Sequence, residues 1–222
     1  MTDAIVKGNH LRFLGKNYFR GGAESVQLWS YGEKKSPITQ TNYLEVQGRI
    51  SVQKPKIRKA TVITIDFDKT TEKDLLVNIN VALVFNGASK TAYQDMKSGK
   101  LKLVKFEVAN EDILDAANAS PDVLEKLIDY GNDARIVDEI FVVMNAELAD
   151  SFASSNSFGV SLSVGAVKIT AEFGAGSSGN TSITLSKGTT FAYGMLKLDW
   201  DANQKKNKTK ITKVTDDQWG PN

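Results

Sequence analysis

Residues 157–173 read SFGVSLSVGAVKITAEF, and their alternation decides how we interpret the rest of the chain. Apolar side chains alternate with small or polar ones, which is the period of a β-strand with one buried face. The apolar set consists of Phe158, Val160, Leu162 and Val164, and after a slip of one residue it continues with Val167 and Ile169. Because such a slip reverses the two faces of a strand, we predict a β-bulge near Gly165.

The same alternation occurs upstream of this stretch, so residues 136–173 are predicted to form one long hairpin. Its tip would be the small, polar segment 150–157. The apolar face of its first strand contains Ile136, Ile140, Val142 and Met144.

A second long hairpin is predicted over residues 61–85, with the charged segment 68–74 at its tip. Its first strand would present Ile63, Ile65 and Phe67 on one face. The apolar face of its second strand would consist of Leu75, Val77, Ile79, Val81 and Leu83.

Between the two hairpins the pattern becomes helical. Ser120-Pro121 starts a helix with proline at its favoured first position, and Gly131 ends it. The sequence therefore predicts an α+β fold with a twisted, mainly antiparallel sheet, long amphipathic hairpins and a few packed helices.

Strand alternation of this kind has two physical explanations. In a membrane barrel the apolar face meets lipid and the polar face lines the lumen, at about ten residues per crossing. In a water-exposed sheet the apolar face packs on helices instead, and this is the commoner case. A protein that converts from the second arrangement to the first would satisfy both.

Composition and charge limit the other classes. The 222 residues carry a formal net charge of +2, and the basic excess lies in 201–222, so no basic face for nucleic acid is expected. The chain has no cysteine, which suits a reducing compartment. Residues 1–10 lack the apolar core of a signal peptide, and no apolar run of about 18 residues occurs. These features predict a cytoplasmic protein without a transmembrane helix.

Motifs for catalysis or cofactor binding are sparse. His10 is the single histidine and is predicted to be a surface residue, so no triad or zinc cluster is expected. Residues 174–179, GAGSSG, match a dinucleotide fingerprint, but 181–186 alternates as a strand where that motif requires a helix. We therefore expect no cofactor, no metal and no enzyme activity, although a site built from carboxylates alone would escape this search.

Residues 201–222 are polar and rich in lysine, and we treat them as a C-terminal tail following a domain of residues 1–200. The large apolar residues of this tail are Ile211, Val214 and Trp219. It is either a disordered extension or a short strand docked on the domain, with Trp219 as the anchor.

The chain resembles the pore-forming domain of gasdermins, in particular the bacterial members. The similarity lies in residues 157–168, SFGVSLSVGAVK, followed by the glycine-serine loop, the threonine-rich strand, the Lys187-Gly188 turn and 191–199, FAYGMLKLD. The helix-glycine-strand unit of 123–140 and the segment 7–15, KGNHLRFLG, are also similar to gasdermin segments.

This resemblance implies an autoinhibited precursor that Ile211, Val214 and Trp219 of the tail hold closed. A protease would remove the tail, and the protomers would then form a homo-oligomer at the membrane. The two hairpins would insert into lipid and permeabilise the membrane, with cell death or antiviral defence as the result.

The main alternative is a non-enzymatic structural or binding module, such as a virion or secretion-machine component.

Overall fold

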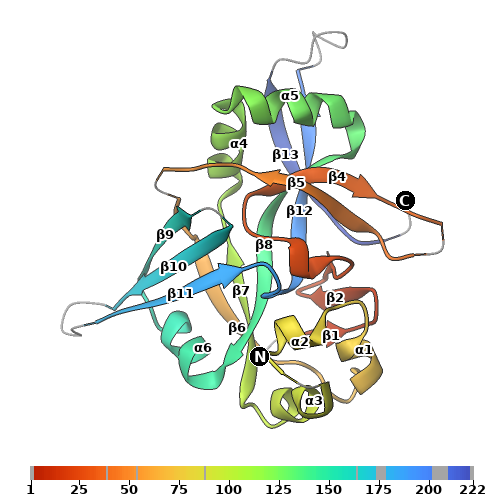
Figure 1. Ribbon diagram of the computed structural model, residues 1–222, viewed down its shortest axis with the longest axis vertical. Coiled ribbons are helices and arrows are strands. Elements are labelled where there is room, and N and C mark those ends of the chain that lie inside the picture. Colours follow the sequence, from red (N-terminus) through yellow and green to blue (C-terminus); the bar gives the residue numbers. More distant parts are fainter. Residues whose placement is uncertain are drawn as a thin grey trace.

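The computed structural model describes residues 3–38, 40–53, 55–87, 89–163, 165–173, 179–201 and 210–220. The chain has an α+β fold in which a curled, mainly antiparallel sheet carries helices at both ends and a smaller sheet on one side (Figure 1). The prediction of the fold class is therefore confirmed.

Two long strands form the centre of the main sheet, β8 (Ala134–Asn145) and β12 (Thr190–Trp200). Strand β8 is buried along nearly its whole length, as expected for a strand covered on both faces. The path β1-β2-β3-β12-β8-β4-β5 is joined by β7 on β8, β6 on β7 and β13 on β12. The remaining strands are β1 (Ile5–Val6), β2 (His10–Phe13), β3 (Lys16–Phe19), β4 (Ser30–Lys35), β5 (Tyr43–Arg49), β6 (Lys59–Ile63), β7 (Leu101–Glu107) and β13 (Ile211–Asp217).

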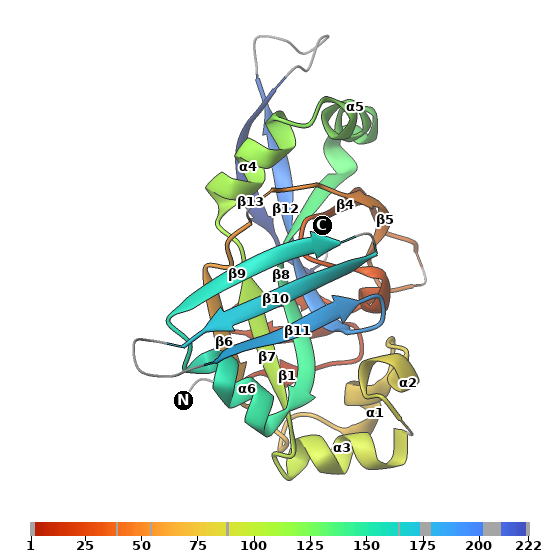
Figure 2. The same ribbon diagram turned by 60° about the vertical axis from the view of Figure 1, so that its left-hand side comes forward.

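A separate three-stranded sheet contains the alternating stretch within residues 157–173. Its strands, in the order β11-β10-β9, are β9 (Ser157–Ser163), β10 (Ala166–Glu172) and β11 (Asn180–Ser186). Figure 2 shows this sheet crossing in front of the main sheet. Apolar side chains face inward and Ser, Thr and Lys face outward, so the predicted alternation is correct and takes the water-exposed form.

The bulge expected near Gly165 is wrong. Val167 pairs with Leu162 and Ala166 with Ser163, so β9 and β10 are the two arms of a tight hairpin. Gly165 has φ +79°, a left-handed conformation that glycine adopts without steric cost. A turn shifts the phase of an alternating pattern as a bulge does, and the sequence pattern did not separate the two.

The helices are α1 (Glu72–Leu76), α2 (Val81–Val84), α3 (Ser89–Lys97), α4 (Asn110–Asn118), α5 (Pro121–Tyr130) and α6 (Ala146–Ala153), with short 3₁₀ turns η1 (Ala23–Ser25) and η2 (Gly131–Asp133). Helix α5 begins and ends as predicted, with Pro121 at its first turn and Gly131 after its last residue.

The second strand of the hairpin predicted over 61–85 does not exist. Leu75 lies in α1, Val81 and Leu83 lie in α2, and Asn78 between the two helices has φ +60°. Local capping explains the difference. A capping box between Thr71 and Asp74 starts α1, and the Asn80 side chain caps α2, so these turns override the alternating pattern.

The hairpin predicted over 136–173 is also wrong as a single unit. Strand β8 ends at Asn145, whose side chain accepts a hydrogen bond from Leu148 N at 2.8 Å and thereby caps α6. The segment 146–153 is therefore helical, and β8 and β9 belong to different sheets.

The buried apolar residues form two clusters. The larger one lies around β8 and β12 and extends under the small sheet. The smaller one lies where β1–β3 meet α1–α3, and it includes Val6, Leu11, Leu75, Val84 and Phe191.

Candidate functional site

Two long insertions leave the main sheet at the same end. The first insertion, residues 64–100, joins β6 to β7, and the second insertion, residues 146–189, joins β8 to β12. At this end Ile63 pairs with Leu103, and Leu101 pairs with Asn145. Thr190, the first residue of β12, pairs with Val142 of β8. Both views place α1–α3 and α6 at this end of the molecule (Figures 1 and 2).

The apolar residues predicted for the first hairpin contribute unequally to the core of the folded chain. Ile63, Ile65 and Leu75 are buried, and Phe67 packs edge-on against Tyr93, with ring centroids 5.5 Å apart. Val77, Ile79 and Val81 are half-buried, whereas 49% of Leu83 is exposed.

The residues predicted for the second hairpin divide between two places. Ile136, Ile140, Val142 and Met144 are buried in β8, in the main core. Val160 and Ile169 are buried beneath the small sheet, and Phe158 and Leu162 are half-buried there. Val164 lies outside the described residues.

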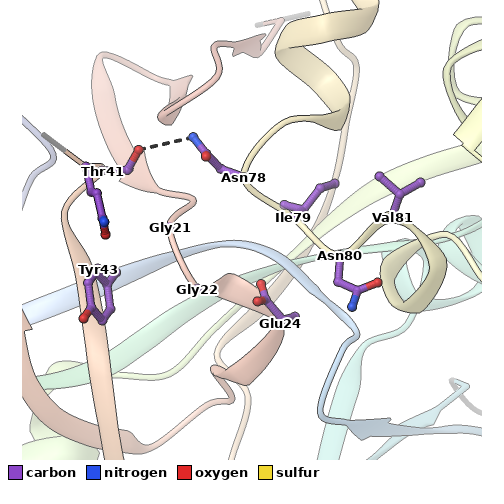
Figure 3. Close-up of a pocket in the computed structure, with 10 residues that line it drawn as sticks. Gly21, Gly22, Glu24, Thr41, Tyr43, Asn78, Ile79, Asn80 and Val81 are labelled. Atoms are coloured by element: carbon purple, nitrogen blue, oxygen red, sulfur yellow. Dashed lines mark hydrogen bonds between the residues drawn. The ribbon is translucent and has the colours of Figure 1, made fainter.

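The first insertion rests against the body across an open, mainly polar cavity of about 830 Å³ (Figure 3). Gly21, Glu24 and Tyr43 line it from the body, and 78–81 line it from the insertion. The Asn78 side chain donates to Thr41 Oγ1 at 3.2 Å, and the Asn80 side chain is used as a helix cap. The insertion is therefore only loosely packed against the body here.

Of the two forms considered from the sequence, a disordered extension or a docked strand, residues 210–220 of the tail adopt the docked strand. Strand β13 pairs antiparallel with β12, and Ile211 and Val214 are buried. The backbone N–H and C=O of Ile211 both bond to the side chain of Asn118 in α4, each at 2.9 Å. Trp219 stacks on His10 with ring centroids 4.5 Å apart. His10 is therefore packed rather than free on the surface, and burial lowers its pKa, with Lys7, Arg20 and Arg12 adding to the effect.

The end of β13 lies on a nearly buried ionic network. Asp217 Oδ2 lies 3.1 Å from Lys34 Nζ and 2.5 Å from Arg135 Nε, and these two cations are among the most buried charged side chains of the structure. Asp216 pairs with Lys16 in a more exposed position. Removal of the tail would leave Lys34 and Arg135 without this carboxylate.

Beside this network, β8 carries two adjacent carboxylates that the sequence interpretation missed. The register between β12 and β8 shifts at Gly194, which brings both Asp138 and Glu139 beside that glycine. A Cβ atom on Gly194 would lie 3.1 Å from Glu139 Oε2 and 3.3 Å from Asp138 Oδ1. The usable sequence signal was a pair of consecutive acidic residues inside an apolar strand.

The environments of the two carboxylates differ. Lys105 Nζ lies 2.7 Å from Glu139 Oε1 and 2.8 Å from Glu107 Oε2. Burial raises the pKa of Asp138 well above its usual range, and the charges of Glu139 and Asp216 add to the effect. A bulged, buried acid of this kind is a common feature of functional sites, but here the tail covers it.

In the described ranges, no three His, Cys, Asp or Glu side chains are placed so that they could hold one metal ion. Within the same ranges, no helix is both long and apolar enough to cross a membrane. No protein-family model, no curated protein and no solved structure gives a significant match to this chain.

Proposed function

We propose that this protein is an autoinhibited pore-forming protein. Its C-terminal tail holds it closed, and after proteolytic removal of the tail it oligomerises and permeabilises membranes. The observation that carries this proposal is the common origin of the two insertions. Both leave the same end of the adjacent antiparallel strands β6-β7-β8-β12.

This arrangement gives a simple route from the closed form to a membrane form. If each insertion became extended, its arms would continue β6 with β7, and β8 with β12. The result is two neighbouring hairpins that prolong the existing sheet in register, and their outer edges would pair with hairpins of neighbouring protomers when the barrel closes. Each arm contains more than the about 10 residues that one strand needs to cross a bilayer.

The sequence of the first insertion suits such a conversion better than its closed structure does. Leu75, Val77, Ile79, Val81 and Leu83 recur at the strand period, yet they occupy two helices of five and four residues. Helices this short are not stable on their own, and they depend on caps and on tertiary contacts. A local pattern that disagrees with the folded state marks a segment with an accessible alternative.

The second insertion already contains the alternating surface. In β9–β11 the apolar side chains face the core and the polar ones face water. On conversion the same apolar side chains would face lipid, and the Ser, Thr and Lys side chains would face the lumen of a homo-oligomeric pore.

The tail is the proposed inhibitor because it covers the edge of β12 and neutralises Lys34 and Arg135. Burial of Ile211 and Val214 stabilises the docked strand by roughly 1.5–3 kcal/mol for each side chain. The resemblance to gasdermins supports the same assignment, with a protease as activator, lipid as the partner and movement from the cytoplasm to the membrane.

Dye release from anionic liposomes tests the proposal. A protease site introduced between Asp201 and Lys210 allows one preparation to be measured uncut and cut, and a chain ending at Trp200 provides a tail-free control. We expect release only from the cut and tail-free proteins. If neither releases dye or sediments with liposomes, the pore is ruled out and a structural or binding module is favoured.

A further inference from the structure

The N-terminal segment, residues 4–20, lies between the tail and the first insertion. It contains β1, β2 and β3, and it contacts both of them. The sheet pairs that join it to the rest are few, since β3 meets β12 through the pair Phe19–Tyr193 alone. Phe13 and Tyr18 also pack on Phe141 of β8, and Phe19 packs on Tyr193 of β12. Contacts with the tail and with the first insertion supply the remaining attachment that this segment shows.

On one side the segment forms the seat of the tail. The Trp219 ring stacks on His10, Trp219 N donates to Asn17 O at 3.0 Å, and Asn17 Nδ2 donates to Trp219 O at 3.3 Å. The Lys16–Asp216 ion pair adds a fourth contact.

On the other side the segment is bonded to the first insertion. Val6 N donates to the buried Thr70 Oγ1 at 3.0 Å, and Gly8 N donates to Asp74 Oδ1 at 3.1 Å. In the reverse direction Asn78 Nδ2 donates to Gly8 O at 2.7 Å. These bonds hold the loop before α1, α1 itself and the turn after it.

Arg20 is the central element of this contact. Its side chain is fully buried and lies over the Phe191 ring, 4.5 Å from the centroid. The guanidinium donates to the backbone oxygens of Lys7 at 2.5 Å, Asp74 at 2.5 Å and Leu75 at 2.7 Å. Asp74 and Leu75 lie near the C-terminal end of α1, where carbonyls lack helical donors.

A five-residue helix depends on its caps and tertiary contacts, so loss of the three bonds from Arg20 is expected to weaken α1. The guanidinium also lies where cations interact favourably with a helix dipole. Arg20 thus bonds the N-terminal segment, through Lys7 O, to the first insertion, through α1.

We propose that residues 4–20 form a clamp that keeps the first insertion folded, and that the tail acts on this insertion by holding the clamp in place. The proposal rests on the proposed function for what release of the insertion achieves. The clamp can be tested without the pore, because the clamp predicts that loss of tail contacts loosens the first insertion, to which the tail makes no direct bond.

Amide hydrogen exchange on the full-length protein, without membranes, tests the clamp. Arg20→Met removes three donors, and Thr70→Val removes one acceptor with little change of shape. Both are expected to speed exchange over residues 70–79 at least 10-fold while β7 and β8 stay protected. Arg12→Met, an exposed change in the same segment, is the matched control and should leave exchange unchanged.

Trp219→Ala tests the transmission through the clamp by truncating a half-buried side chain at the edge of the main core. We expect faster exchange in β2 and β3 and also over residues 70–79. If Arg20→Met and Thr70→Val leave 70–79 protected, or if Trp219→Ala loosens only β13, β2 and β3, the clamp is refuted. Dye release alongside such a result would refute the clamp alone, whereas a confirmed clamp without dye release would refute the pore alone.

Discussion

The two neighbouring aspartates at the end of β13 occupy different environments. Asp217 contacts the nearly buried Lys34 and Arg135, whereas Asp216 and its partner Lys16 each keep more than a third of their side chain exposed. Removing one member of a buried pair costs about 3–5 kcal/mol, while an exposed pair contributes about 1 kcal/mol or less.

We therefore expect Asp217→Ala to lower the unfolding temperature strongly and to cause dye release from the uncut protein. Asp216→Ala is the matched control and should behave almost as the wild type does. Thermal unfolding and liposome leakage measured on both variants check this prediction, and equal effects of the two changes would contradict it.

The raised pKa of Asp138 determines how the stability of the folded protein changes with pH. Burial and the charges of Glu139 and Asp216 raise the pKa of the Asp138 carboxyl in the folded protein above its value in the unfolded chain. The stability that this carboxyl contributes is therefore fully present below about pH 4, where it is protonated in both states. That contribution is lost as the pH rises towards the raised pKa.

Asp138→Asn cannot ionise, so its stability relative to the wild type should increase from pH 4 to pH 8. Urea unfolding of both proteins across this range measures the difference. A difference that stays constant with pH, or that changes in the opposite direction, would contradict a raised pKa of Asp138 in the folded protein.

At the scale of residues, part of the predicted apolar face is buried, namely Ile136, Ile140, Val142 and Met144 in β8 and Val160 and Ile169 in the small sheet. The single-face prediction for β8 did not include Val137 and Phe141, which are fully buried as well. The sequence did not predict the ionic network under the tail. Asp217, Lys34 and Arg135 are far apart along the chain, and only the register of β13 on β12 brings them together.

At the scale of elements, alternation predicted the faces of strands but not their partners. Residues 157–163 and 166–172 form strands as expected, because they pair with each other and cover an apolar surface. Residues 75–83 alternate equally well but form short helices, because β6, their predicted partner, pairs with β7 instead and local caps favour helical turns.

At the scale of the whole molecule, the sequence predicted the α+β class and the mainly antiparallel sheet. It did not predict that the two insertions share one end, since this follows from the non-local pairing of β8 with both β7 and β12. Pairing between segments separated by the second insertion leaves no periodic signal in the chain.

The conversion of the two insertions into membrane hairpins is tested most directly by far-UV circular dichroism of the cut protein before and after binding to anionic vesicles. About 25% of the closed protein is helical and 45% is strand. We predict that helix is lost and strand is gained on the vesicles, because α1–α3 and α6 become arms of hairpins, while the uncut protein keeps its spectrum. An unchanged helical signal in cut protein that is bound to vesicles and releases dye would contradict the conversion of the insertions.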